Sequence, residues 1–155
     1  MMELAVLSAA FAMGAAIPDR YAGPNGSPPL SWSEVPAHTQ SIAVLCDDPD
    51  APAGDWIHWV LFNLAPETRA LPENVARDAQ LPGKAIQGLN DYNRVGYDGP
   101  WPPPGQTHRY FFKVFALDTR LSLDSKARKK DLLRAMQGHV LAQGALSGTY
   151  ARKSK

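Results

Sequence analysis

Cysteine is almost absent from this chain of 155 residues: Cys46 stands alone, so no disulfide can form within the chain. Long apolar runs are also missing, and no stretch reaches the ~18–20 apolar residues of a membrane-spanning helix. The N-terminal run MMELAVLSAAFAMGAA has Glu3, and no Lys or Arg, where a secretory signal peptide is basic. These absences predict a cytoplasmic protein that needs no oxidising compartment.

An excess of charge of either sign is missing as well. Sixteen Lys and Arg residues oppose fifteen Asp and Glu residues, which gives a formal net charge of +1. There is therefore no global electrostatic reason to expect nucleic acid or an anionic membrane as a partner.

Motifs of catalysis and metal binding are equally lacking. The sequence contains no GxSxG, HxH, HExxH or CxxC pattern, and no glycine-rich phosphate loop of the Walker or Rossmann type. Cys46 ends an apolar run directly before Asp47, where burial and adjacent carboxylates would raise the pKa of its thiol. We therefore predict a non-enzymatic protein with no metal or cofactor, and a hydrolase built on a His–Asp pair is the weakest alternative.

Proline and glycine are abundant, with 14 and 12 copies, which favours a loop-rich β protein. Apolar and β-branched runs predict strands at 41–46, 56–64 and 109–117, with a weaker candidate at 3–11. Apolar residues at helical spacing predict a C-terminal helix over 124–144, and a second helix is expected around 72–79. Strands followed by a late helix predict a mainly β fold: one domain over 1–155, an antiparallel sheet sandwich with peripheral helices.

Alternation along two of these strands places a histidine beside an aromatic residue. In WIHWV, Trp56 and His58 share one face, while Ile57 and Trp59 share the other. In HRYFF, His108 and Tyr110 share a face. Both strands follow proline-rich loops, so we expect the two pairs to converge with the acidic loop DDPDAP if those loops lie at one end of the sandwich.

Two interpretations of these histidines remain open at this point. Each ring can be a half-buried strand residue whose hydrogen bonds are satisfied locally. Alternatively, imidazole and hydroxyl donors can line a pocket for a small anion, with a carboxylate that orients one of the rings. The basic clusters at 126–130 and 152–155 are interpreted as a solvated helix end and a frayed tail.

Longer motifs resemble a known family. NGSPPLSW (25–32), DDPDAP with WIHWVLFNL, QGLNDYNRVGYDGPWPPPGQTHRYFFKVFALD and AMQGHVLAQGALSGTYAR (135–152) are similar to the phosphatidylethanolamine-binding protein family, in its bacterial Raf kinase inhibitor-like branch. The resemblance covers nearly the whole chain. It implies a sandwich of two antiparallel sheets with short flanking helices, and a small cavity that takes phosphate-like groups, including phospholipid headgroups, and acetate-like ions.

The resemblance also implies which residues form that cavity. Carried over position by position, they are Asp48, Trp56, His58, Gly99, Pro103, His108 and Tyr110. His58 and His108 would be the main donors and Asp48 the residue that orients a histidine. Asp47, Asp50 and Asp55 are interpreted as turn formers and caps. Trp101 is a departure from the family pattern, and its indole is expected to narrow or cover the cavity.

The predicted function is binding of a phosphate-like or carboxylate anion, with a phosphoethanolamine headgroup as one candidate ligand. The alternative is a regulatory protein that docks on a kinase or protease, with the pocket as a modulator. A homodimer is expected by resemblance alone.

Overall fold

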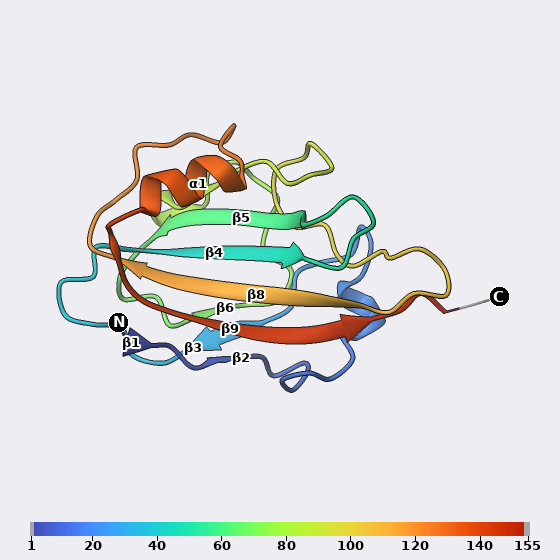
Figure 1. Ribbon diagram of the computed structural model, residues 1–155. Helices are drawn as coiled ribbons and strands as arrows, with labels where there is room; N and C mark the ends of the chain where they lie inside the picture. The colour runs from blue at the N-terminus through green and yellow to red at the C-terminus, as the bar shows by residue number, and fades with distance from the viewer. Residues whose placement is uncertain (1, 154–155) are drawn as a thin grey trace.

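A six-stranded sheet is the centre of the computed structural model, which describes residues 2–153 (Figure 1). Its strand order is β1-β9-β8-β4-β5-β7. These strands are β1 (Met2–Glu3), β9 (Val140–Tyr150), β8 (His108–Leu117), β4 (Ser41–Asp48), β5 (Trp56–Leu64) and β7 (Ile86–Gln87). All pairs are antiparallel except β1–β9, which is parallel. The predicted strands at 41–46, 56–64 and 109–117 are β4, β5 and β8.

A second, three-stranded sheet has the order β2-β3-β6. Its strands are β2 (Val6–Leu7), β3 (Leu30–Trp32) and β6 (Ala70–Leu71). The main apolar core joins the two sheets, with Trp32 and Leu30 of β3 in the same cluster as Val44 of β4 and Phe112 of β8. The other face of the large sheet is covered by α1 (Lys129–Met136), whose Leu132 and Met136 pack with Leu45 of β4. The prediction of a mainly β sandwich with peripheral helices is therefore confirmed.

The predicted helix over 124–144 is wrong in its extent. Only eight residues, Lys129–Met136, are α-helical, and residues 140–144 begin the long strand β9. Gly138 has a φ of 81° and reverses the chain after the helix, and β9 then pairs with β8 from Val140 to Tyr150. Apolar residues at 140 and 141 happen to continue the helical spacing, but ten residue pairs with β8 decide the conformation.

The expected helix around 72–79 is absent, and that segment is a loop. Its carbonyl groups are used by a side chain: Nε2 of Gln87 donates to the backbone oxygens of Ala76 and Asp78, at 2.7 and 2.8 Å. Within residues 2–153, two short 3₁₀ helices (Asp19–Tyr21 and Pro82–Lys84) complete the helical structure. No helix of this part of the chain has the length and apolar character needed to cross a bilayer.

Candidate functional site

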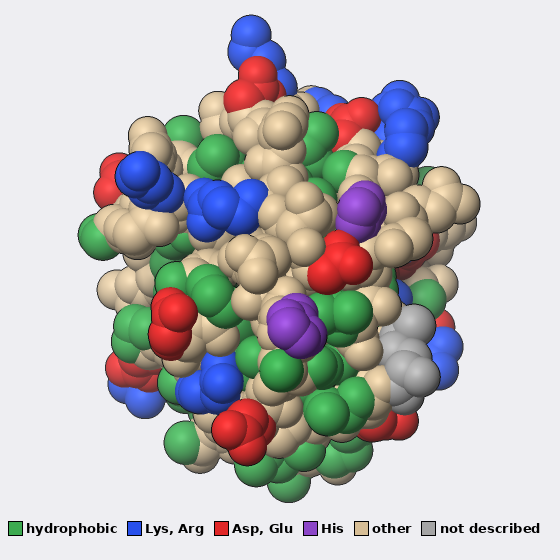
Figure 2. Space-filling model, turned by 90° about the vertical axis from the view of Figure 1, so that its left-hand side faces the viewer, with side chains coloured by type: hydrophobic (Ala, Val, Ile, Leu, Met, Phe, Trp, Pro, Cys, Tyr) green, Lys and Arg blue, Asp and Glu red, His purple; other side chains and the backbone are tan. Residues whose placement is uncertain are grey.

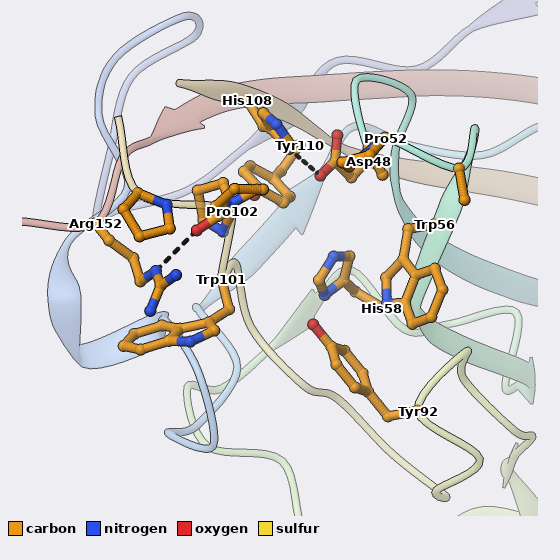
Figure 3. A pocket seen from close by; sticks show the side chains of 14 residues that line it. Asp48, Pro52, Trp56, His58, Tyr92, Trp101, Pro102, His108, Tyr110 and Arg152 are labelled. Carbon is orange, nitrogen blue, oxygen red and sulfur yellow. Dashed lines mark hydrogen bonds and ion pairs between the residues drawn. The ribbon is translucent and has the colours of Figure 1, made fainter. Parts of the chain in front are cut away.

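A cavity of about 440 Å³ lies at the end of the sandwich where β4 ends and β5 and β8 begin (Figure 3). Six of the seven predicted site residues line it: Asp48, Trp56, His58, Pro103, His108 and Tyr110. The walls are completed by the loops 51–53 and 101–104, by Tyr92, and by Arg152 just beyond β9. The two proline-rich loops thus lie at the same end of the sandwich. This is the condition under which we expected the two histidines to converge.

Gly99 does not line this cavity. A Cβ built on Gly99 would lie 2.1 Å from the carbonyl oxygen of Tyr21, so only glycine allows this close approach of two backbones. Its amide also donates to the carbonyl of Gly23 at 2.7 Å. Gly99 therefore positions the loop that leads to Trp101 instead of contacting the cavity.

A β-bulge in β5 sets the direction of the site's side chains. Cys46 pairs with Trp59, whereas Asp47 pairs with Ile57, so His58 is an extra residue in the ladder. As a result Trp59 joins the core between the sheets, while Ile57 packs on the α1 side. The prediction that Ile57 and Trp59 share a face is therefore wrong, although Trp56 and His58 both line the cavity.

Asp48 and His108 form a buried pair at the upper wall of the cavity in Figure 3. Nδ1 of His108 lies 2.7 Å from Oδ2 of Asp48, and both side chains are 4 % exposed. The other carboxylate oxygen of Asp48 accepts the backbone N–H of Asp50 at 2.8 Å. The histidine that Asp48 contacts is therefore His108.

His108 has no free ring nitrogen in this arrangement. Its Nε2 lies 2.7 Å from Oε1 of Gln106, an exposed residue of the loop before β8. We expected His108 to be a main donor to the ligand. In the structure its Nε2 already bonds to the amide oxygen of Gln106, so a ligand would have to displace this side chain.

His58 lies at the floor of the cavity, in edge contact with the rings of Tyr110 and Tyr92. Its Nδ1 is 2.6 Å from the backbone oxygen of Asp98, and the residue is 2 % exposed. Burial lowers the pKa of His58, against the opposing effects of the Asp98 carbonyl and the Asp48 carboxylate. The ring is consequently neutral near neutral pH.

Asp98 itself anchors the segment that holds His58. The buried carboxylate accepts from Asn90 Nδ2 at 2.7 Å and forms ion pairs with Arg77 and Arg94 at 3.1 and 2.7 Å. These contacts lower the pKa of Asp98 although burial alone would raise it. This network is structural, and it fixes the carbonyl group that orients His58.

Two buried donors on the cavity wall have no protein partner. The indole Nε1 of Trp56 and the hydroxyl of Tyr110 make no hydrogen bond of normal length to any residue that the structure describes, although Asp48 lies near enough to the Tyr110 hydroxyl, and Trp56 near enough to the Tyr92 hydroxyl, to affect the pKa values of these tyrosines. Burial, with the negative charge of Asp48, raises the pKa of Tyr110, so its hydroxyl keeps its proton. Unpaired buried donors are uncommon in folded proteins because each costs about 1–3 kcal/mol.

Trp101 stands at the rim and supports a cation. The guanidinium of Arg152 lies over its indole, 4.7 Å from the ring centroid, and Nε of Arg152 donates to the backbone oxygen of Pro102 at 2.8 Å. The indole is 53 % exposed, so it forms one side of the mouth and leaves the cavity open. The interpretation of 152–155 as a frayed tail is wrong for Arg152, and positions 154 and 155 lie outside the described residues.

Sequence reasoning missed Tyr92, Gln106 and Arg152. Tyr92 belongs to the quoted motif QGLNDYNRV, so it carried a signal that was not used. Gln106 and Arg152 also lie within quoted motifs, in GQTHRYFF and at the end of AMQGHVLAQGALSGTYAR, but a glutamine in a loop and a single arginine beyond a strand are residue types common on protein surfaces. In residues 2–153 there is no group of three or more His, Cys, Asp or Glu side chains placed to hold a metal ion.

Comparison with known proteins agrees with this architecture. A family model described as "Phosphatidylethanolamine-binding protein" matches residues 7–151. A UPF0098 protein of Methanothermobacter thermautotrophicus is 52 % identical over 138 residues, which cover 88 % of this chain and 91 % of the relative. A UPF0098 protein of Aquifex aeolicus is 44 % identical over 151 residues, covering 95 % of this chain and 88 % of the relative.

Two solved structures are also similar. A phosphatidylethanolamine-binding protein homolog from Chlamydia trachomatis superimposes with a TM-score of 0.88 at 39 % identity, covering 99 % of this chain and 100 % of the other. E. coli YbcL, described as a member of the mammalian family, superimposes with a TM-score of 0.90 at 32 % identity, covering 97 % and 99 %.

Proposed function

Since this chain belongs to the phosphatidylethanolamine-binding protein family, we propose that its cavity binds a small phosphate-like or carboxylate anion without catalysing a reaction. A phosphoethanolamine headgroup is one candidate ligand of this class. The observation that carries the proposal is the pair of buried, unpaired donors, Trp56 Nε1 and the Tyr110 hydroxyl. Oxygen atoms of an anion are the acceptors that these donors lack.

The charges around the cavity support an anion over a cation. The carboxylate of Asp48 faces His108, and among the described residues Arg152 forms no ion pair with a carboxylate. Only its Nε is used, by the backbone oxygen of Pro102, so the two terminal nitrogens of the guanidinium remain for a ligand. Planar guanidinium groups bind phosphate and carboxylate through two parallel hydrogen bonds.

The size of the cavity supports a small ligand. Its volume of about 440 Å³ is at the lower end of the usual range for ligand sites, ~300–1,000 Å³. Aromatic rings and prolines form its sides, and such rigid walls lose little conformational freedom when a ligand binds.

Histidine NMR gives a direct test. The chain has four histidines, of which His38 is exposed and His139 is paired with Asp118 on the surface. Titration with phosphate and with phosphoethanolamine should shift the ring signals of His58 and His108 and leave those of His38 and His139 in place. Unmoved His58 and His108 signals at millimolar ligand would contradict the proposal.

Docking on a protein partner is the second candidate, and one observation favours it. Trp101 and Tyr92 are 53 % and 38 % exposed at the rim of the cavity, and exposed aromatic residues are enriched in protein interfaces. A partner captured from the host whose binding persists in His58→Ala and His108→Ala, but not in Trp101→Ala, would favour docking with the pocket as a modulator. Loss of the partner in the histidine variants would favour anion binding as the primary role.

A further inference from the structure

The hydrogen bond of His58 determines where its proton resides. A carbonyl oxygen has no hydrogen to give, so the contact of 2.6 Å to the Asp98 backbone requires a proton on Nδ1. In the neutral ring the other nitrogen, Nε2, is then an acceptor. Nε2 has no hydrogen-bond partner among residues 2–153, and its edge of the ring faces the cavity in Figure 3.

The groups around His58 do not supply a second proton. The carboxylates nearest to it are Asp48 on β4 and Asp91 and Asp98 in the segment between β7 and β8. His108 faces the first of these, and Arg77 and Arg94 face the third. The aromatic neighbours are the neutral rings of Tyr92 and Tyr110, and burial outweighs the carboxylates in lowering the pKa of His58.

The cavity therefore offers several donors and, on His58, a neutral acceptor to the same ligand. Trp56 Nε1, the Tyr110 hydroxyl and the guanidinium of Arg152 donate, whereas His58 Nε2 accepts. An anion with no hydrogen on its oxygens, such as sulfate, would place a lone pair against the lone pair of Nε2. A ligand oxygen that carries a hydrogen would instead donate to it.

We propose that the ligand is a phosphate or phosphate monoester bound in its protonated, singly charged form, with its P–OH group donating to Nε2 of His58. The remaining oxygens accept hydrogen bonds from Trp56, Tyr110 and Arg152. This inference rests on the proposed function and specifies its ligand. His58 becomes the specificity residue that selects phosphate monoesters over sulfate and over phosphodiesters, which have no acidic hydrogen.

Protonation of the ligand sets a pH range for this selection. The second pKa of a phosphate monoester is about 6, so the singly charged form is a substantial species slightly below neutral pH and is scarce above pH 7.5. Binding to the wild-type chain should therefore weaken as the pH rises. If His58 instead took up a proton, its Nε2 would donate to a doubly charged ligand, and sulfate would then bind as well as methyl phosphate.

Calorimetric titration of the full chain with methyl phosphate, dimethyl phosphate and sulfate tests the proposal, with inorganic phosphate in parallel to separate a free ion from an ester ligand. At pH 6.5 methyl phosphate should bind at least tenfold more tightly than sulfate or dimethyl phosphate. Its affinity should fall roughly tenfold between pH 6.5 and pH 7.5, as the monoanion is depleted. Titrations in buffers of different ionisation enthalpy should show the same proton linkage.

Two variants separate the inference from the proposed function. His58→Gln should reduce the preference for methyl phosphate over sulfate to less than threefold, because an amide group can donate as well as accept. Tyr110→Phe should weaken all ligands by a similar factor and keep the preference. Equal affinities of the wild-type chain for methyl phosphate and sulfate, or an affinity that does not fall with rising pH, would overturn the inference while anion binding stands. Binding of none of the anions would overturn both.

Discussion

Two adjacent aspartates at the end of β4 face opposite sides of the large sheet and have different surroundings. Asp47, on the α1 side, accepts from the ammonium groups of Lys113 and Lys129 at 3.0 and 3.1 Å. Asp48, on the side of the cavity, accepts from His108 and from the backbone of Asp50. Their side chains are 2 % and 4 % exposed, so burial does not distinguish them.

The surroundings of each carboxylate distinguish the two sides. Lys129 joins Asp47 to Asp55, and together with Lys113 these four charged groups satisfy one another beside the helix. Around Asp48 the neighbouring donors Trp56 Nε1 and the Tyr110 hydroxyl have no protein partner. A buried carboxylate alone is thus weak support for a binding site, and unpaired donors beside it are much stronger support. The interpretation of Asp47 as a turn former is wrong, since it is a buried ion-pair partner within β4.

The two ends of the sandwich differ in a similar way. Figure 2 shows the end opposite to the cavity, where Lys and Arg side chains lie among Asp and Glu side chains and apolar groups are scattered between them. Charges so intermixed are solvated or paired locally, and isolated ion pairs of this kind contribute little, about 0–1 kcal/mol each. The cavity end instead combines rigid aromatic walls with a guanidinium held over Trp101.

Replacing Asp47 and Asp48 one at a time should give the largest difference in stability between the two sides of the sheet. Asp48→Ala leaves the buried imidazole of His108 without its partner and should lower the free energy of unfolding by about 3 kcal/mol. Asp47→Ala should lower it by only about 1 kcal/mol, because Lys113 and Lys129 are 34 % and 23 % exposed and can be hydrated. Urea denaturation measures both values, and equal losses would show that the two carboxylates are equivalent.

Arg152→Ala should have the largest effect on phosphate affinity relative to its effect on stability. Loss of a charge-assisted hydrogen bond of about 1.5–3 kcal/mol corresponds to a dissociation constant that is roughly 10- to 100-fold larger. Lys153→Ala is the matched control, since it removes the same charge from the next residue, which pairs with Asp19 outside the cavity. If both variants bind phosphate equally well, Arg152 has no part in the site.

The two tryptophans of β5 give a matched comparison of a paired and an unpaired indole. Nε1 of Trp59 donates to Oε1 of Gln87 at 2.7 Å, whereas Nε1 of Trp56 has no protein partner. Trp59→Phe should therefore cost about 1–3 kcal/mol more stability than Trp56→Phe, because it leaves a buried acceptor unpaired. Trp56→Phe should instead weaken phosphate binding by about tenfold. Thermal denaturation measures the stability of the two variants, and calorimetry measures their affinity for phosphate. A larger loss of affinity in the Trp59 variant than in the Trp56 variant would refute the prediction.

The smallest effect expected is a two-step dependence of stability on pH. The pKa of His58 is lowered by burial, so below its ordinary value of about 6.5 the unfolded chain binds a proton that the folded chain does not. Stability should therefore fall as the pH falls below 6.5. Hydrogen bonds from Arg109 hold the pKa of Asp50 at about 2, so its contribution is present above pH ~4 and is lost as the pH falls toward 2.

Single variants assign the two steps. In melting curves from pH 8 to pH 2, His58→Gln should flatten the change below pH 6.5, and Asp50→Asn should flatten the change below pH 4. Asp50 and Arg109 lie outside the cavity, so Asp50→Asn should leave phosphate binding unchanged. A His58→Gln variant with an unaltered slope between pH 6.5 and pH 5 would contradict the neutral state of this ring.

Local patterns predicted β4, β5 and β8 well, but not the longest strand, β9. The runs at 41–46, 56–64 and 109–117 are strands because their apolar and β-branched side chains suit the covered faces of the large sheet. The short strands β3, β6 and β7, of two or three residues each, were missed, since so few residues carry no period. Strand β9 was read as helix because Val140 and Leu141 extend the spacing of Leu132 and Met136 by chance.

The residue types of the candidate site were accessible from the sequence, because imidazole, hydroxyl and carboxylate groups keep their chemistry in any fold. Their partners were not, because partners come from elements distant along the chain. Asp48 meets His108 across 60 residues, and Arg152 meets Pro102 across 50. The bulge at His58 and the return of the chain end to Trp101 arise from strand register and packing. The contact of His58 with the Asp98 carbonyl, 40 residues away, decides which nitrogen of His58 faces the cavity, and so which ligand we expect it to select.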